Sequence, residues 1–554
     1  MNRLIMRPLA LSLGALASAA VLAQPVPPPD ASPDALRQRS IDTERRILEE
    51  QRRRDPVVRD PIDADAIKPP VPPRRVTPSG TRFRVQEIRF SASELLSAQE
   101  LVSIAAEFEG KEQSFAELQA LIERVNALYK SKGIITAAAT IPSQEVVGGV
   151  VNVRLVEGRV GRLAIEGNNT TDEDYVRNRI AQRPAALVDL ATLESDLQYF
   201  NRTHDAQIRA ELEPGRIFGT TDVVLKMLEP SRHSLGLYVG NAGSPSTGEY
   251  QGGLVYTNRS LFGFRDDLVL SAAGAEGHRG YAIAYSVPVN RFGGRLSLGH
   301  YDDRTKVVHG AFKPLGIESE SVSDILSFRQ PLLLRERERL SAVLSAKKRV
   351  GETLVSGTPL QGTSVLTYVV GLESSLVRDA WILQANASRA EGHESQPTER
   401  PFHTWRGTAS ALREISPGYS ARAAFTWQAG SSEFLPTSEQ HYLGGDSSVR
   451  GYTPAFLVGT KGYAANFEFH FPLVGPSGNS STSVSGLVFH DVGSVSRPPG
   501  TASVKDRIAS VGAGVSIALE RLGSLRIAVG FKLNDRPEDV RAYRIHFQLV
   551  SSPF

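Results

Sequence analysis

The nine residues from Tyr463 to Phe471 read YAANFEFHF and alternate strictly between two kinds of side chain. Alternation with a period of two is typical of a β-strand that has one apolar and one polar face. The apolar face carries Tyr463, Ala465, Phe467, Phe469 and Phe471, and the other face carries Ala464, Asn466, Glu468 and His470. Such a strand fits both a soluble β-sandwich and a membrane barrel, so alternation alone does not decide between them.

The number of such segments decides between the soluble β-sandwich and the membrane barrel. The same pattern recurs at 419–428, 525–533 and 543–549, and helical patterns vanish after Arg232. We expect sixteen strands, beginning near Ser234, Gly248, Asp267, Arg279, Gly294, Ser321, Arg339, Thr363, Ala380, Phe402, Tyr419, Gly462, Ser483, Arg507, Ser524 and Ala542. An even number of strands of about ten residues each has the dimensions of a membrane barrel. The sequence therefore predicts a mainly β protein whose residues 231–554 form a 16-stranded antiparallel transmembrane β-barrel, with a lumen wide enough for water or a plug.

The first eighty residues contain three predicted segments. Arg3 and Arg7 precede an apolar stretch that ends in Val21-Leu22-Ala23, which is typical of a secretory signal peptide at residues 1–23. Residues 31–54 predict a helix, and its best block, Asp34 to Arg54, is polar nearly all round; it is either a solvated charged arm or a helix in a wet cavity. Residues 55–80 form a Pro-rich linker, with seven prolines between Asp55 and Pro78.

Two similar modules follow, at residues 81–159 and 160–230. Each shows the element order β-α-α-β-β over about 75 residues, which indicates an internal repeat. In the second module Thr171 is expected to cap a helix whose first turn is acidic. Small sheets of this kind have exposed edges that can accept a strand from a partner.

Composition argues against several classes of function. The chain has no cysteine, which excludes disulfides, thiol nucleophiles and thiolate metal sites. We find no G-x-S-x-G, Walker or H-E-x-x-H sequence, and we predict no enzyme activity, catalytic residue, cofactor or metal. His490 and Asp491 are neighbours on a predicted strand and therefore point to opposite faces, so they cannot act as a dyad. The net charge of +3 gives no reason to expect nucleic acid.

Two motifs carry the candidate functional residues. The longest connection, between Ala429 and Lys461, contains Val449-Arg450-Gly451-Tyr452. On the thirteenth strand Phe489, Asp491 and Gly493 share one face, while Val488 and Val492 share the other. If the valines face lipid, Asp491 faces the lumen and Arg450 can fold inward as its bidentate partner. A charge-assisted contact of this kind contributes about 1.5 to 3 kcal/mol, enough to bias a loop without locking it.

Taken together, the signal peptide, polar helix, linker, repeated modules, sixteen strands and two motifs resemble the TpsB transporters of two-partner secretion, the exporters of haemolysins and adhesins. The resemblance covers essentially the whole mature chain and identifies the modules as POTRA-like. It implies that Arg450 at the tip of an inward-folded loop pairs with Asp491, and that the helix at 31–54 plugs the resting pore. A barrel-assembly insertase is the alternative, although such relatives generally carry more periplasmic repeats. A passive porin needs neither repeats nor a linker.

The resemblance also implies location and partners. The barrel is expected in the bacterial outer membrane, in contact with its lipid, and the POTRA-like modules in the periplasm. The modules would bind the N-terminal secretion domain of an unfolded TpsA-type exoprotein, an adhesin or haemolysin. The barrel-assembly machinery would recognise Phe554, but Phe547 and Phe554 fall on opposite parities, which leaves the register of that signal open.

Overall fold

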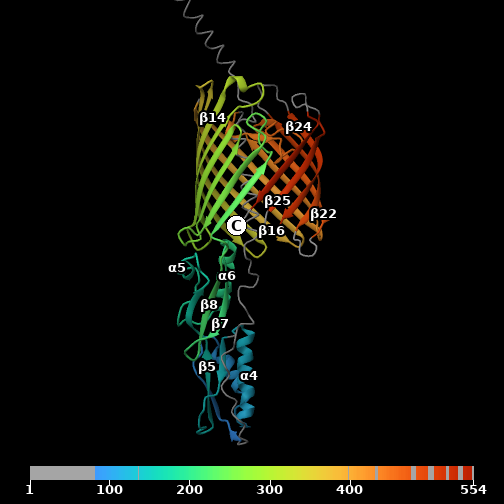
Figure 1. Cartoon of the computed structure of the whole chain (residues 1–554). Helices are drawn as coiled ribbons and strands as arrows, with labels where there is room; N and C mark the ends of the chain where they lie inside the picture. The colour runs from blue at the N-terminus through green and yellow to red at the C-terminus, as the bar shows by residue number, and fades with distance from the viewer. Residues whose placement is uncertain are drawn as a thin grey trace, which may run out of the picture.

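The computed structural model describes residues 82–551, apart from Ile135, Pro397, 431–433, 476–481, 497–504, 520–522 and 535–540. The predicted signal peptide, the helix at 31–54, the whole linker at 55–80 and Phe554 lie outside the described residues and stay predictions. Figure 1 shows two modules that follow one another below a barrel of tilted strands. Within the described residues, no helix is both long enough and apolar enough to cross a membrane.

The first module is a three-stranded sheet backed by two helices. Its sheet has the order β2-β5-β4, in which β2 runs parallel and β4 antiparallel to β5, and a separate pair joins β1 to β3. The elements are β1 Phe83–Arg84, β2 Glu87–Phe90, α3 Ala98–Ala105, β3 Glu112–Gln113, α4 Phe115–Ser131, β4 Ala137–Thr140 and β5 Val150–Glu157. Leu118, Leu121, Ile122 and Val125 recur at helical spacing, and α4 buries them in the module's core.

The second module repeats this arrangement, with the order β6-β8-β7. Its elements are β6 Arg159–Glu166, α5 Glu173–Arg177, α6 Leu190–Thr203, β7 Gln207–Pro214 and β8 Thr220–Leu228. The predicted cap of α5 is wrong by one residue. Asp172 occupies the cap and accepts hydrogen bonds from the backbone N–H groups of Asp174 and Tyr175, because the hydroxyl of Thr171 instead donates to Glu229.

Sixteen antiparallel strands form the closed barrel that the sequence predicts. They are β9 His233–Gly240, β10 Gln251–Arg259, β11 Asp267–Ala275, β12 His278–Pro288, β13 Arg295–Lys306, β14 Ile317–Leu334, β15 Glu338–Val355, β16 Thr358–Arg378, β17 Trp381–Gln396, β18 Arg400–Ser416, β19 Tyr419–Gly430, β22 Lys461–Val474, β23 Ser483–Ser496, β24 Lys505–Leu519, β25 Gly523–Lys532 and β26 Tyr543–Ser551. The largest difference from the expected starts is at β16, expected near Thr363 and observed from Thr358. Among the described residues, the seam between β9 and β26 contains four residue pairs, fewer than any other pairing in the barrel.

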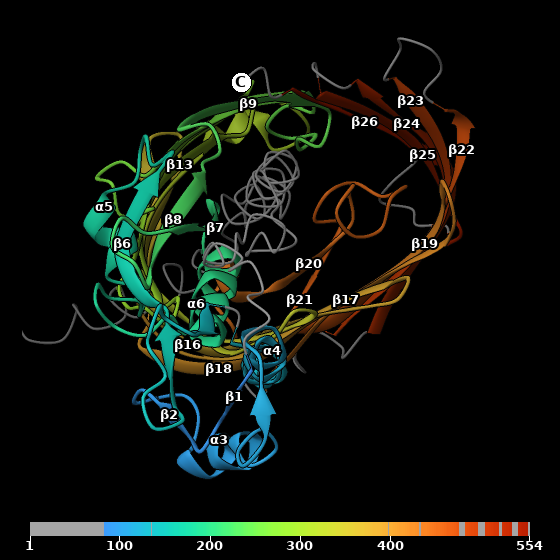
Figure 2. The same cartoon turned by 90° about the horizontal axis from the view of Figure 1, so that it is seen from below.

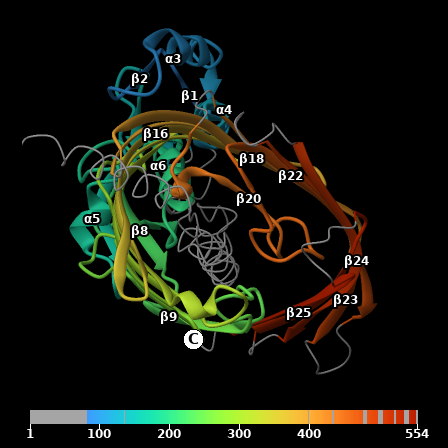
Figure 3. The ribbon, with the colours of Figure 1, turned by 90° about the horizontal axis from the view of Figure 1, so that it is seen from above.

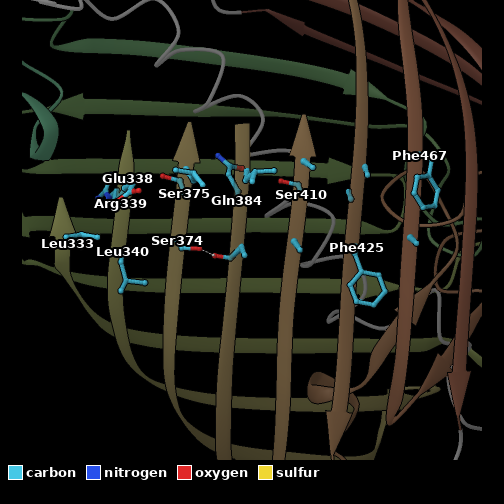
Figure 4. A pocket seen from close by; sticks show the side chains of 18 residues that line it. Leu333, Glu338, Arg339, Leu340, Ser374, Ser375, Gln384, Ser410, Phe425 and Phe467 are labelled. Carbon is cyan, nitrogen blue, oxygen red and sulfur yellow. Dashed lines mark hydrogen bonds between the residues drawn. The ribbon is translucent and has the colours of Figure 1, made fainter. Parts of the chain in front are cut away.

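The outer wall is largely apolar, as expected of a lipid-facing surface, although His490 also lies on it. The pairing register aligns Phe467 with Ala423 and His490, all on the face opposite Asn466 and Glu468. A hollow of about 620 Å³ on this wall is lined largely by small residues such as Ala409 and bordered by aromatic and aliphatic side chains (Figure 4). The aliphatic and aromatic side chains at its border include Leu333, Leu340, Phe425 and Phe467, which are labelled in Figure 4.

Candidate functional site

The long connection between β19 and β22 folds into the barrel instead of standing above it. It carries a 3-10 turn, η3 Thr437–Glu439, and a short hairpin of β20 His441–Leu443 and β21 Leu457–Gly459. Figures 2 and 3 show this hairpin inside the circumference of the barrel. We call residues 434–443 and 457–460 the base of the loop, and residues 444–456 its tip. The first sequence motif therefore lies in the tip, within the lumen.

The tip brings Arg450 onto Asp491 of β23. Arg450 Nε donates to Asp491 Oδ2 at 2.8 Å and Nη2 donates to Oδ1 at 2.7 Å, so the pair is bidentate. The backbone N–H of Arg450 adds a third hydrogen bond to Oδ2 at 3.0 Å. Asp491 is fully buried and Arg450 is 2% exposed. A buried charge pair of this geometry holds the tip against the wall, and either charge alone would be costly to bury.

A second carboxylate, Glu468 of β22, completes the charge cluster. Arg450 Nη1 donates to Glu468 Oε1 at 2.5 Å, and Arg526 Nη2 of β25 donates to the same oxygen at 2.9 Å. His470 Nε2 lies 3.1 Å from Glu468 Oε2. The motif-based prediction did not include Glu468, although its place on the polar face of the YAANFEFHF strand was a usable signal.

The aromatic ring of Phe489 packs against the guanidinium group of Arg450. The Cζ atom of Arg450 lies 3.6 Å from the centroid of the Phe489 ring, which is the geometry of a cation–π contact. The Phe489 ring in turn lies over Gly512 of β24, where an added Cβ would meet ring atom Cζ at 2.3 Å. Phe489 thus faces the lumen beside Asp491, and Gly512 is a site residue that the sequence motifs do not include.

The remaining motif residues position the tip. Val449 and Tyr452 are fully buried in one apolar cluster with Leu443 of the base, and the Tyr452 hydroxyl donates to the backbone oxygen of Asn534 at 2.8 Å. Gly451 has φ +108°, a conformation that residues with a Cβ rarely adopt. At Gly493 an added Cβ would come within 2.9 Å of Leu443 Cδ1, so a side chain here would require Leu443 to shift for the loop to dock.

Together these contacts form a latch, which we define as Arg450 with Asp491 and Glu468. It joins a loop to the wall of a wide barrel. On the wall its contacts are made by side chains, so they can break without unfolding the strands. Among the described residues, no group of three or more His, Asp or Glu side chains could hold a metal ion. The arrangement is suited to gating a passage.

A second polar cluster joins the second module to the barrel. The side chain of Arg265, in the turn between β10 and β11, is fully buried and donates from Nε to Asp205 Oδ1 at 2.9 Å. Burial alone would raise the pKa of Asp205, but the charge and hydrogen bonds of Arg265, together with the charge of Arg259, outweigh burial and hold that pKa below its usual range. Tyr199 of α6 also donates to the backbone oxygen of Phe292, in the next periplasmic turn, at 3.0 Å. The module is therefore fixed to two adjacent turns.

Comparison with known proteins identifies the family and the fold. The model of the haemolysin secretion/activation protein ShlB/FhaC/HecB family matches residues 219–517, and the model of the ShlB-type POTRA domain matches residues 83–158. Outer membrane transporter CdiB of Dickeya dadantii is 26% identical over 404 residues, which cover 69% of this chain and 71% of that protein. The heme/hemopexin transporter protein HuxB of Haemophilus influenzae is 22% identical over 484 residues, covering 82% of this chain and 84% of that protein.

Solved structures agree on the fold. CdiB from Escherichia coli superposes with a TM-score of 0.63 at 18% identity, covering 96% of this chain and 99% of that structure. BamA from Haemophilus ducreyi, lacking POTRA domains 1-3, gives a TM-score of 0.57 at 14% identity and covers 85% of this chain and 100% of that structure. Because the ShlB/FhaC/HecB model spans more than half of the 554 residues, this chain belongs to the haemolysin secretion/activation family, the transporters of two-partner secretion.

Proposed function

We propose that this outer-membrane transporter exports its secreted partner as an unfolded chain through the barrel, and that the latch gates the passage. The observation that carries the proposal is the buried Arg450–Asp491–Glu468 cluster, which ties a loop across the lumen of a 16-stranded barrel. A loop tip held by one cluster of charges can move aside when a polypeptide enters. It can dock again when the polypeptide has left.

Recognition would take place in the periplasm, where the two modules lie. Each of their sheets has two edge strands: β2 and β4 in the first module, and β6 and β7 in the second. An N-terminal secretion domain in extended form can add a strand to such an edge, and the backbone hydrogen bonds would tolerate many side-chain sequences. We assign this role to residues 81–159 and 160–230. The barrel itself would contact outer-membrane lipid, and the barrel-assembly machinery would insert it.

The energy for export has to come from the partner, because the sequence contains no nucleotide-binding motif. Folding of the emerging chain outside the cell would prevent its return and draw the rest outward. A partner variant that cannot fold outside should therefore stall in the barrel. Unchanged secretion of such a variant would refute this energy source.

The experiment that tests the gate is Arg450→Ala. It removes the bidentate pair with Asp491 and the contact with Glu468, so partner export should be lost while the barrel stays inserted and heat-modifiable. Arg329→Ala is the matched control, because Arg329 is a half-exposed lumen arginine paired with Glu373 at 3.1 Å, outside the latch. Normal export by Arg450→Ala would remove the loop from the mechanism.

A further inference from the structure

The base of the long loop has its own charged contact, away from the latch. Glu439, in η3, is fully buried, although it is a charged residue in a connection between strands. Its Oε1 lies 2.8 Å from Lys347 Nζ on β15 and accepts from Thr367 Oγ1 on β16 at 3.4 Å. Its Oε2 lies 2.7 Å from Arg406 Nη2 on β18. Two cations thus converge on one carboxylate.

The backbone of the base is held at the same place. The backbone oxygen of Glu439 accepts from Arg406 Nη2 at 2.7 Å and from Gln428 Nε2 at 2.8 Å. Gln428 Nε2 also donates to the backbone oxygen of Thr460 at 3.0 Å, on the returning limb of the loop. Arg406 Nε donates to Gln428 Oε1 at 2.9 Å, which fixes the amide. Both limbs of the base are therefore tied to the wall formed by β15 to β19.

The latch uses a different part of the wall. The residues of this cluster, Glu468, Asp491 and Arg526, lie on β22, β23 and β25, and within the described part of the chain none of them forms a hydrogen bond or ion pair with Glu439. Between Glu439 and Arg450 the chain forms β20, which pairs with β21 on the returning limb, and then passes through Gly444 and Gly445, with φ of +109° and +86°. Two consecutive glycines in this region form a backbone joint that other residues would stiffen.

We propose that Glu439, with Lys347 and Arg406, is a second and independent anchor of the loop, a fixed pivot about which the tip swings when the latch opens. Glu439 is a positioning residue for the export proposed above, and the inference rests on that function. Opening the latch frees the tip and leaves the base on the wall, so the loop returns to the same docking place after each passage. Losing the anchor instead loosens the base and leaves the latch closed.

Thiol labelling can separate the two events, because the chain has no cysteine of its own. Ser438→Cys reports on the base, since the Oγ of Ser438 is buried without a hydrogen-bond partner among the described residues and the change sacrifices no contact. Ser448→Cys reports on the tip, where Ser448 is 8% exposed. Each reporter is combined with Glu439→Gln and with Asp491→Asn in the full chain in outer membranes, and labelled with a membrane-impermeant maleimide without any partner present.

Glu439→Gln should raise the labelling rate at position 438 by about 10- to 100-fold, the factor for one lost charge-assisted contact, and leave position 448 unchanged. Asp491→Asn should raise the labelling rate at position 448 and leave the rate at position 438 unchanged. The matched control is Glu373→Gln, which removes an exposed lumen ion pair with Arg329 and should change neither rate. A rise at both positions in either variant would refute independence, and an unchanged rate at 438 in Glu439→Gln would refute the anchor.

The labelling result does not depend on what is transported. A second measurement, partner export by Glu439→Gln, should fall while heat-modifiability of the barrel persists. If the labelling pattern appears but export by Glu439→Gln and Arg450→Ala is normal, the anchor stands and the proposed function fails. If export depends on Arg450 but labelling at 438 does not depend on Glu439, the function stands and the anchor fails.

Discussion

Replacing Asp491 by asparagine should release the tip of the loop without disturbing the barrel. Asp491 accepts three hydrogen bonds from Arg450, at 2.7, 2.8 and 3.0 Å, in a fully buried site. Asparagine keeps one acceptor oxygen but turns an N–H₂ group toward the guanidinium, so it loses both the charge and at least one contact. Glu468 remains to pair with Arg450.

The size of the effect follows from this geometry. Breaking a buried ion pair costs about 3 to 5 kcal/mol, and the surviving contact with Glu468 places this case near 3 kcal/mol. Every 1.4 kcal/mol is tenfold in an equilibrium, so the ratio of released to docked tip should rise about 100-fold. The rise concerns only the loop, because the strands keep their own backbone pairing.

Maleimide labelling of Ser448→Cys measures the released fraction directly. The Ser448 hydroxyl donates to the backbone oxygen of Gly444 at 3.0 Å and is buried when the tip is docked. The rate should rise by up to about 100-fold in the Asp491→Asn background if exposure follows the equilibrium population. Ser447→Cys is the control, since Ser447 is exposed already and should label equally fast in both backgrounds. An equal rate at position 448 with and without Asp491 would show that this pair does not hold the tip.

Two further predictions concern the resting pore and the periplasmic part. Deleting residues 34–54 should raise channel conductance in planar bilayers, because the predicted helix would no longer obstruct the lumen; unchanged conductance would make the plug hypothesis wrong. Burial lowers the pKa of His204, at the end of α6, to about 3. Below pH 6.5 the unfolded chain therefore binds more protons than the folded chain, and the free energy of unfolding of this region should fall as pH falls. At pH 5 it should be about 2 kcal/mol lower than at a pH well above 6.5. Hydrogen exchange of the α6 amides, corrected for intrinsic rates, should therefore increase about 15-fold between pH 6.5 and 5, and the increase should disappear in His204→Gln.

Much of the fold could be predicted because barrel strands follow a simple rule. Residues that face lipid alternate with residues that face water, so YAANFEFHF and its relatives reveal both the strands and their faces. The same rule puts Asp491 on the inner wall. The cap of α5 could not be predicted as well, because Thr171 and Asp172 are both good caps and the choice depends on the distant Glu229.

The parts of the site that sequence patterns miss are those created by the closure of the barrel. Glu439 lies in an irregular connection with no periodicity, and its partners Lys347 and Arg406 come from strands far away in the chain. Gly512 is one of two glycines in its strand, and the ring of Phe489 and the backbone oxygen of Val529 give it a role. Such residues meet through strand register, which no local pattern encodes.

The buried Arg265 joint has a mechanical consequence. It fixes the second module to the turn between β10 and β11, and β10 pairs directly with β9, which forms the four-pair seam with β26. Because this joint is rigid, a cargo that pulled on the module would exert a torque on this part of the barrel and would not merely bend a flexible linker. Under the proposed function the module would work as a handle, and force on it would reach the barrel beside the seam that has the fewest residue pairs among those described.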